Sequence, residues 1–254
     1  MRSVDAALGV PAPSGQVASR ACLDRMFKDN MAHHTMIARD HAMQSGYEQQ
    51  WALAGMSLAA FKLEQADQPL SPQALEWLRA LARAVMDFHD HHSLQNNHLL
   101  WTALGVGTTG YLTGDQELID WANESTRQSL STMNPDGTLA LELLRGPKAS
   151  AYHYFAAQPV FVYSAVRRCF HDPPRAPWPD QLERLSAVLD RIEDDPQFLA
   201  QRAGVPQRAI TPEQSQWRAL FAPAGDRTPL PRIDASVGRR GGQLSTTARA
   251  LDCH

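Results

Sequence analysis

The stretch Gln95-Asn96-Asn97-His98-Leu99-Leu100-Trp101 decides how the middle of this chain folds. Its polar half passes directly into an apolar half, and the helical pattern continues to about residue 112. Asn is a poor residue inside a helix, but it suits the turn that starts one, because its side chain accepts a hydrogen bond from a free backbone N–H group. We therefore expect a helix to begin here, with His98 in its first turn, where N–H groups and the helix dipole favour an anion.

This stretch alone allows two interpretations. One is a helix cap beside a solvated histidine, which is the commoner arrangement. The other is part of a site that binds a carboxylate and moves a proton, since two carboxamides and an imidazole can supply both functions. Features elsewhere in the chain have to decide between them.

Size and charge limit the class of protein. A chain of 254 residues forms one large domain or two small ones and can bury a substantial core. The net charge of −3 lacks the basic excess typical of proteins that coat nucleic acid, so we expect no nucleic-acid partner. No apolar run reaches the roughly 18 residues that a membrane span needs. The first residues lack the apolar segment of a signal peptide, which indicates the cytoplasm if the start is correct.

Cysteine and histidine spacing argues against a metal centre. Three scattered cysteines, Cys22, Cys169 and Cys253, suggest neither a disulfide framework nor a zinc site. His89, His91 and His92 lie close together, but in a predicted loop and without the i, i+4 spacing of helical zinc ligands. We expect this loop to favour an anionic ligand, and we expect no metal and no cofactor.

Apolar periodicity predicts helices joined by short turns and no convincing strand. The turn signals include Ser71-Pro72, Thr113-Gly114-Asp115 and Asn134-Pro135-Asp136-Gly137. The predicted helices cover about 26–43, 50–64, 72–88, 97–112, 115–130, 149–170 and 180–192. We expect an all-α domain of antiparallel helix pairs over residues 21–221. A loose arm is expected over 1–20 and a disordered tail over 222–254, which is rich in Gly, Pro, Arg, Ser and Thr.

A second cluster of chemically active residues follows the turn at residues 134–137. Arg145 and Lys148 bring two cations three residues apart, and Tyr152-His153-Tyr154 brings two phenols and an imidazole. A buried aromatic belt is one interpretation of the second group. Combined with Asn97 and His98, the cluster also supplies what β-elimination from a uronic acid needs. The substrate carboxylate must be neutralised, and a base and an acid must move protons.

The chain resembles the alginate lyase family, whose best-known members are mannuronate-specific. The resemblance covers roughly residues 45–220, and five blocks carry it: Gln50-Trp51-Ala52-Leu53-Ala54-Gly55, Asn96 to Trp101, Asp136-Gly137-Thr138-Leu139 with Glu142-Leu143, Ala149 with Ala151-Tyr152-His153, and Asp195-Pro196-Gln197-Phe198. It implies an incomplete α/α toroid, periplasmic localisation and no cofactor. Because the match starts near the beginning of the chain, we expect the N-terminal helices of the toroid to be lacking.

The resemblance also implies roles for particular residues. Asn97 matches the Asn that neutralises the substrate carboxylate, and His98 matches the catalytic His. Lys148 falls at the position of an Arg in the family, and Arg145 could compensate for the bidentate contact that Lys cannot make. The catalytic Tyr of the family lies seven residues after that Arg, and Phe155 occupies this position here.

Three interpretations remain open for the proton-transferring group. Tyr154 takes the role, or Tyr152 takes it from one turn earlier, or the protein binds polyuronate without cleaving it. We expect Trp101 and His153 to contact the sugar chain. The leading prediction is a polysaccharide lyase that leaves a 4,5-unsaturated uronate end. The alternatives are a non-catalytic binder of acidic polysaccharide and an all-α scaffold whose aromatic residues only fill the core.

Overall fold

The structure, a computed structural model, describes residues 43–92, 95–221 and 238–253 and a few positions between 25 and 37. Over these residues the chain is helical, and extended pairing is limited to isolated bridges such as Met133–Leu139. The all-α class predicted from the sequence is therefore confirmed. The longer helices are α3 (Met43–Glu64), α4 (Pro72–His92), α5 (Asn97–Thr113), α6 (Gln116–Ser131), α8 (Ala149–Cys169) and α9 (Trp178–Asp194). The short ones are α7 (Ala140–Leu143), η1 (Gly146–Lys148), α10 (Ala200–Ala203), α11 (Pro212–Ser215), η2 (Gln216–Phe221), η3 (Gly238–Arg240) and α12 (Leu244–Ala250).

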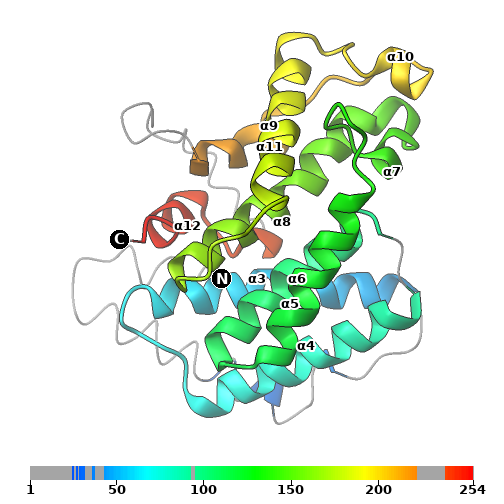
Figure 1. The fold of residues 1–254 in the computed structure, drawn as a ribbon. Helices are drawn as coiled ribbons and strands as arrows, with labels where there is room; N and C mark the ends of the chain where they lie inside the picture. The colour runs from blue at the N-terminus through cyan, green and yellow to red at the C-terminus, as the bar shows by residue number, and fades with distance from the viewer. Residues whose placement is uncertain are drawn as a thin grey trace.

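Helix α5 lies at the centre of the fold and packs against α3, α4, α6 and α8 (Figure 1). It begins where the sequence predicts, because the Asn96 side chain accepts a hydrogen bond from the His98 N–H at 3.0 Å. It ends at Gly114, whose φ of 64° is left-handed and suits glycine. Almost every residue between is buried, so the apolar run of the opening stretch becomes the core of the molecule.

The histidines predicted to lie in a loop, His89, His91 and His92, lie instead in the last turns of α4. The ring Nδ1 atoms of His91 and His92 each hydrogen-bond a backbone carbonyl four residues earlier, at 2.7 and 2.9 Å. His89 is buried and hydrogen-bonds Gln50. The helix continues because its histidines make hydrogen bonds with backbone carbonyls of α4 and with Gln50 of α3. Local helix propensity did not indicate these bonds.

The C-terminal segment 238–253 is ordered and packed, contrary to the predicted disordered tail. Its backbone is fastened to α3 by the buried Lys62, whose Nζ donates to the carbonyl oxygens of Gly241 at 2.7 Å and Gln243 at 3.2 Å and to Thr246 Oγ1 at 2.9 Å. Leu244 and Ala248 join the main core. Residues 222–237 and the arm 1–20 lie outside the described residues, as does most of the helix expected over 26–43.

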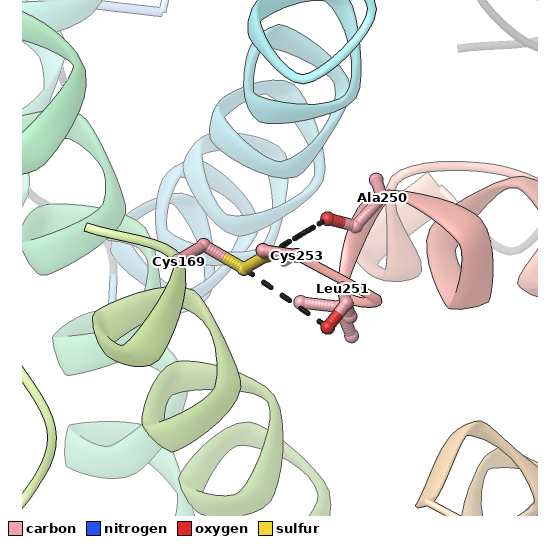
Figure 2. The surroundings of a disulfide bond; sticks show 4 residues. All are labelled: Cys169, Ala250, Leu251 and Cys253. Atoms are coloured by element: carbon pink, nitrogen blue, oxygen red, sulfur yellow. Dashed lines mark hydrogen bonds between the residues drawn. A yellow bond between two sulfur atoms is a disulfide. The ribbon is translucent and has the colours of Figure 1, made fainter. Parts of the chain in front are cut away.

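A disulfide between Cys169 and Cys253 corrects the prediction that the cysteines form no such link (Figure 2). The two residues are 84 positions apart in sequence, but their Cα atoms lie 5.3 Å apart. Cys169 ends α8 and Cys253 follows α12, so only the folded chain brings them together. The bond gives the C-terminal segment a covalent attachment to α8 in addition to its contacts with α3.

None of the helices among the described residues is long and apolar enough to cross a bilayer. Successive helices pack in pairs instead, α3 with α4 and α5 with α6. This arrangement leaves the N-terminal end of α5 beside α7 and the start of α8, where a pocket opens.

Candidate active site

A pocket of about 410 Å³ lies at the start of α5. Five elements line it, including two that come from distant parts of the chain. The residues are Trp51 from α3, Asn97 and His98 from α5, Ala151, Tyr152, Phe155 and Gln158 from α8, Glu213 and Gln214 from α11, and Arg239 and Arg240 from η3. Predicted site residues Asn97, His98 and Tyr152 are thus brought together.

Gln50 controls the protonation of His98. Gln50 Oε1 accepts hydrogen bonds from His89 Nε2 at 2.8 Å and from the Thr102 hydroxyl at 3.2 Å. Its amide nitrogen, 2.9 Å from His98 Nδ1, therefore donates to that ring atom. Because Nδ1 is an acceptor, the neutral ring carries its proton on Nε2.

The surroundings of His98 keep the ring neutral. Burial, and secondarily the positive charge of Arg145, lower the pKa of His98 to about 4. The ring stacks on Tyr47 with their centroids 3.8 Å apart, and Trp51 lies at 5.8 Å. At neutral pH His98 is a rigidly held hydrogen-bond donor rather than a cation.

Asn97 is held by a buried carboxylate. Its backbone N–H donates to Glu142 Oε1 at 2.9 Å, and its Nδ2 lies 3.0 and 3.2 Å from the two carboxylate oxygens. An ionised carboxylate only accepts hydrogen bonds, so the amide nitrogen must face Glu142. Asn97 Oδ1 is buried and has no hydrogen-bond partner among the described residues. The polar group that Asn97 leaves unpaired is therefore an acceptor, whereas the predicted role calls for a donor to a carboxylate.

Arg145 and Tyr152 form a cation–π pair beside the pocket. The guanidinium carbon of Arg145 lies 4.7 Å from the centroid of the Tyr152 ring. Arg145 also pairs with Glu142, with Nε and Oε2 3.4 Å apart. Glu142 thus links Asn97 to the cation above Tyr152, so three predicted site residues share one network.

Tyr154 faces away from the pocket. It is fully buried, and its hydroxyl donates to the backbone oxygen of Leu189 at 2.9 Å and contacts Glu193 Oε1 at 2.8 Å, both on α9. Burial and the neighbouring Glu193 raise the pKa of Tyr154 well above its ordinary value. Of the two tyrosines that the sequence left as candidates for proton transfer, only Tyr152 lines the pocket.

Trp101, His153 and Lys148 do not line the pocket either, and Arg145 lies beside it without lining it. Trp101 is fully buried, and its Nε1 donates to the carbonyl of Phe155 at 3.1 Å, so it belongs to the core. His153 is also fully buried; its Nε2 accepts from the N–H of Leu139 at 2.9 Å and its Nδ1 donates to Ala149 O at 2.8 Å. Lys148 is exposed at the end of η1. The helical phase of α8 and its packing against α5 decide these orientations, and residue type alone did not reveal them.

Several residues of this site were not singled out from the sequence: Gln50, Glu142, Gln158, Arg239 and Arg240. Gln50 and Glu142 lie inside blocks that carry the family resemblance, so their position was a usable signal. The two arginines lie in a stretch whose composition indicated disorder, and no local pattern pointed to the pocket. Within the described part of the chain, no three His, Cys, Asp or Glu side chains gather as metal ligands.

Comparison with known proteins finds relatives that are described as alginate or polysaccharide lyases. The family described as alginate lyase matches residues 19–174, more than half of the chain. A polysaccharide lyase of Stenotrophomonas maltophilia K279a is 30% identical over 180 residues, which are 70% of this chain and 54% of that protein. An alginate lyase of Azotobacter chroococcum mcd 1 is 30% identical over 166 residues, 62% of this chain and 45% of that protein. The chain thus spans about half the length of these curated relatives.

Solved structures share the fold. The crystal structure of alginate lyase A1-III from Sphingomonas species A1 superposes with a TM-score of 0.72 at 22% identity, covering 91% of this chain and 69% of that one. A variant of alginate lyase A1-III complexed with a tetrasaccharide gives a TM-score of 0.74 at 20% identity, covering 91% and 72%. The described helices therefore adopt the incomplete α/α toroid that the resemblance implied.

Proposed function

Because the chain belongs to the alginate lyase family, we propose that it is a polysaccharide lyase that cleaves an alginate-like polyuronate by β-elimination. The observation that carries this proposal is that Asn97, His98 and Tyr152 line one pocket, with Arg145 over the phenol ring. These are the residue types that the reaction needs, and they come from two different helices.

The reaction needs one proton to leave C5 of a uronate and one to reach the departing glycosidic oxygen. Tyr152 performs both transfers. Its phenolate takes the C5 proton, the C4–O bond breaks as the C4–C5 double bond forms, and the same proton then passes to the leaving oxygen. The guanidinium of Arg145 above the ring stabilises the negative charge of the phenolate.

Two observations support Tyr152 over its neighbours. The Tyr154 hydroxyl is hydrogen-bonded to Leu189 and Glu193 on α9, and Phe155 has no proton to transfer. Arg145 and Tyr152 are also seven residues apart, the separation that the family resemblance gives for its Arg and catalytic Tyr. We therefore assign this pair to Arg145 and Tyr152 in place of Lys148 and Phe155.

His98 acts as a fixed donor in this mechanism. Its Nε2–H contacts the substrate carboxylate, onto which negative charge spreads when C5 loses its proton. Asn97 Oδ1 accepts a hydrogen bond from a sugar hydroxyl, which satisfies an oxygen that lacks a partner among the described residues.

A location in the periplasm is part of the proposal. Disulfides persist in oxidising compartments and are rare in the cytosol, so the Cys169–Cys253 bond supports it. Periplasmic protein in which Cys169 and Cys253 are labelled only after reduction would agree with this location, whereas cytoplasmic protein with free Cys169 and Cys253 would contradict it.

The test is an elimination assay with matched tyrosine variants. We expect polymannuronate, incubated with the full chain, to give the ultraviolet absorbance of an unsaturated uronate end. Tyr152→Phe should lower kcat roughly 10²- to 10⁴-fold, because it removes the proton-transferring group. Tyr154→Phe, the same change on the same helix, should keep kcat within a few-fold, and it costs about 1 kcal/mol of stability through its lost hydrogen bond.

Polyguluronate and polyglucuronate serve as comparison substrates. A folded protein that yields no unsaturated product from any of the three polymers would exclude the lyase. A larger loss of kcat in Tyr154→Phe than in Tyr152→Phe would overturn the assignment of the tyrosine. A gain of activity in Phe155→Tyr would show that a tyrosine at position 155, where the family resemblance places the catalytic Tyr, can transfer the proton.

A further inference from the structure

The pocket holds two arginines whose hydrogen-bonding groups are not all used. The guanidinium carbon of Arg239 lies 4.9 Å from the ring centroid of Phe155 and 5.6 Å from that of Trp51. Arg240, 8% exposed, donates from Nη2 to the backbone oxygen of Glu213 at 2.7 Å. Arg239 Nε and Arg240 Nε and Nη1 are buried and have no hydrogen-bond partner among the described residues.

A buried N–H group without a hydrogen-bond partner is costly, and the oxygens of a bound anion would supply the partners that these three nitrogens lack. Burial lowers the pKa of Arg239. Burial and the charge of Arg239 lower the pKa of Arg240 to about 10, against a smaller opposing effect of Glu213. Both groups are still protonated at neutral pH, so two adjacent positive charges face one pocket.

Other charged groups leave these two cations without full compensation. Glu213 is the only carboxylate among the described residues that line the pocket, and its side chain is exposed at the rim. Its hydrogen bond to Arg240 uses the backbone oxygen. The pKa of its carboxyl is lowered by hydrogen bonds with its own backbone and with Thr211, and to a smaller extent by the charge of Arg240. Arg145 is paired with Glu142, and His98 is neutral. An incoming anion is the partner that this set of groups lacks.

The arginines are held in place before any ligand arrives. Gly241, directly after Arg240, is fixed by its carbonyl bond to Lys62, and the Thr247 hydroxyl lies 3.5 Å from the backbone oxygen of Arg240. The disulfide of Cys253 attaches the far end of the segment to α8. Such preorganisation reduces the entropy that binding would otherwise lose.

We propose that Arg239 and Arg240 bind the carboxylate of a uronate residue, so that the C-terminal segment 238–253 supplies the anion-binding part of the site. The proposal rests on the proposed function and deepens it. A guanidinium group forms two parallel hydrogen bonds to a carboxylate, which Lys148 could not do from any position. The indole of Trp51 beside Arg239 offers a flat apolar face to the sugar ring.

Calorimetric titration of the full chain with a saturated oligomannuronate tests this subsite. The Tyr152→Phe background slows cleavage during the titration. Arg239→Gln and Arg240→Gln should each weaken binding roughly 10- to 100-fold, because each removes charge-assisted hydrogen bonds from a desolvated site. Arg239→Lys keeps the charge and should weaken binding less than Arg239→Gln. Affinity for a neutral mannan oligomer of the same length should not change.

Arg249→Gln is the matched control, because Arg249 lies on the same segment but is exposed and outside the pocket. Oligomannuronate affinity equal to the background in both pocket variants would overturn the subsite, as would an equal loss in Arg249→Gln. Arginine-dependent binding by a chain that makes no unsaturated product would leave the subsite standing and exclude the lyase. If Arg239→Gln and Arg240→Gln, made in the chain that keeps Tyr152, form product with an unchanged KM, the lyase stands and the subsite is excluded.

Discussion

At the scale of single residues, the orientation of the polar groups in this site is set by hydrogen-bond partners that do not line the pocket. Gln50 selects which nitrogen of His98 holds the proton, and Glu142 selects which end of Asn97 faces the pocket. His153 contributes in the same way, since it holds Leu139, the residue from which α7 and its Glu142 begin. Residues with no contact to the pocket thus decide what chemistry it can perform.

Gln50→Glu tests this control through the pH dependence of kcat/KM. A carboxylate accepts the Nδ1 proton of His98 and raises its pKa from about 4, because it favours the imidazolium. Above the raised pKa the proton stays on Nδ1, so Nε2 no longer donates. We therefore expect kcat/KM of Gln50→Glu to fall roughly 10- to 100-fold as pH rises through that value.

The wild-type His98 is neutral and donates from Nε2 on both sides of neutral pH, so its kcat/KM should not show this fall. Gln50→Leu removes the amide without adding a charge and should lower kcat/KM with no new pH dependence. Identical pH profiles for wild type and Gln50→Glu would show that Gln50 does not set the tautomer of His98.

At the scale of helices, α5 serves as the support of the site because its neighbours approach it closely. Glycines along it leave room for them: Gly105 faces Leu53 and Ala54 of α3, and Gly107 faces the ring of Tyr163 on α8. The contact with α8 is the one that matters for the proposed function, since α8 carries Tyr152 and α5 carries His98. The spacing of these two helices sets the width of the pocket.

Gly107→Ala should therefore destabilise the protein although alanine is the better helix former. A Cβ at this position would overlap the buried ring of Tyr163. We expect a loss of about 1–3 kcal/mol in the free energy of unfolding, measured with chemical denaturant. In an uncrowded helix the same substitution stabilises by about 1 kcal/mol, so the sign of the change is itself the test. A stabilised Gly107→Ala would show that α5 and α8 are not closely packed there.

At the scale of the whole molecule, the pocket joins the middle of the chain to its end. Helix α3 provides Trp51, α5 provides His98 and α8 provides Tyr152. Residues 238–253 return across α3 and bring Arg239 and Arg240 to the pocket (Figure 1). The Cys169–Cys253 bond closes this path and attaches the returning segment to the end of α8 (Figure 2). Stability and anion binding should consequently depend on the same bond.

Cys253→Ser should lower both properties. We expect a loss of about 2–4 kcal/mol in unfolding free energy, because the unfolded chain is no longer constrained by the long disulfide loop. Weaker binding of oligomannuronate should accompany it, since the arginines are less firmly held. A reducing agent should reproduce both changes in wild type and neither in Cys253→Ser. Unchanged affinity in the variant would indicate that the contacts of Lys62 hold the segment without the disulfide.

Much of the fold follows from local pattern. Apolar periodicity predicted six long helices. Their bounds were right to within a few residues, except that α3 begins seven residues earlier, at Met43, and α4 continues through its histidines. Asn96 was also predicted as the start of α5. Local signals suffice there because helix caps, turns and apolar stripes act over a few neighbouring residues. The pairing of the Asn97-His98 block with the Tyr152 block also came from the sequence, through the family resemblance.

Tertiary structure decided which of the candidate side chains share the pocket. Tyr152 and Tyr154 are equivalent by residue type, but the packing of α8 between α5 and α9 points only Tyr152 inward. Arg239 and Cys253 lie in a segment whose composition resembles a disordered tail, and its order depends on partners far away in sequence, Lys62 and Cys169. The sequence by itself predicted the long helices and the kind of chemistry that we propose. Long-range packing depends on every helix at once. It determined which side chains point into the pocket, and it determined that the positive charge there comes from the C-terminal segment 238–253.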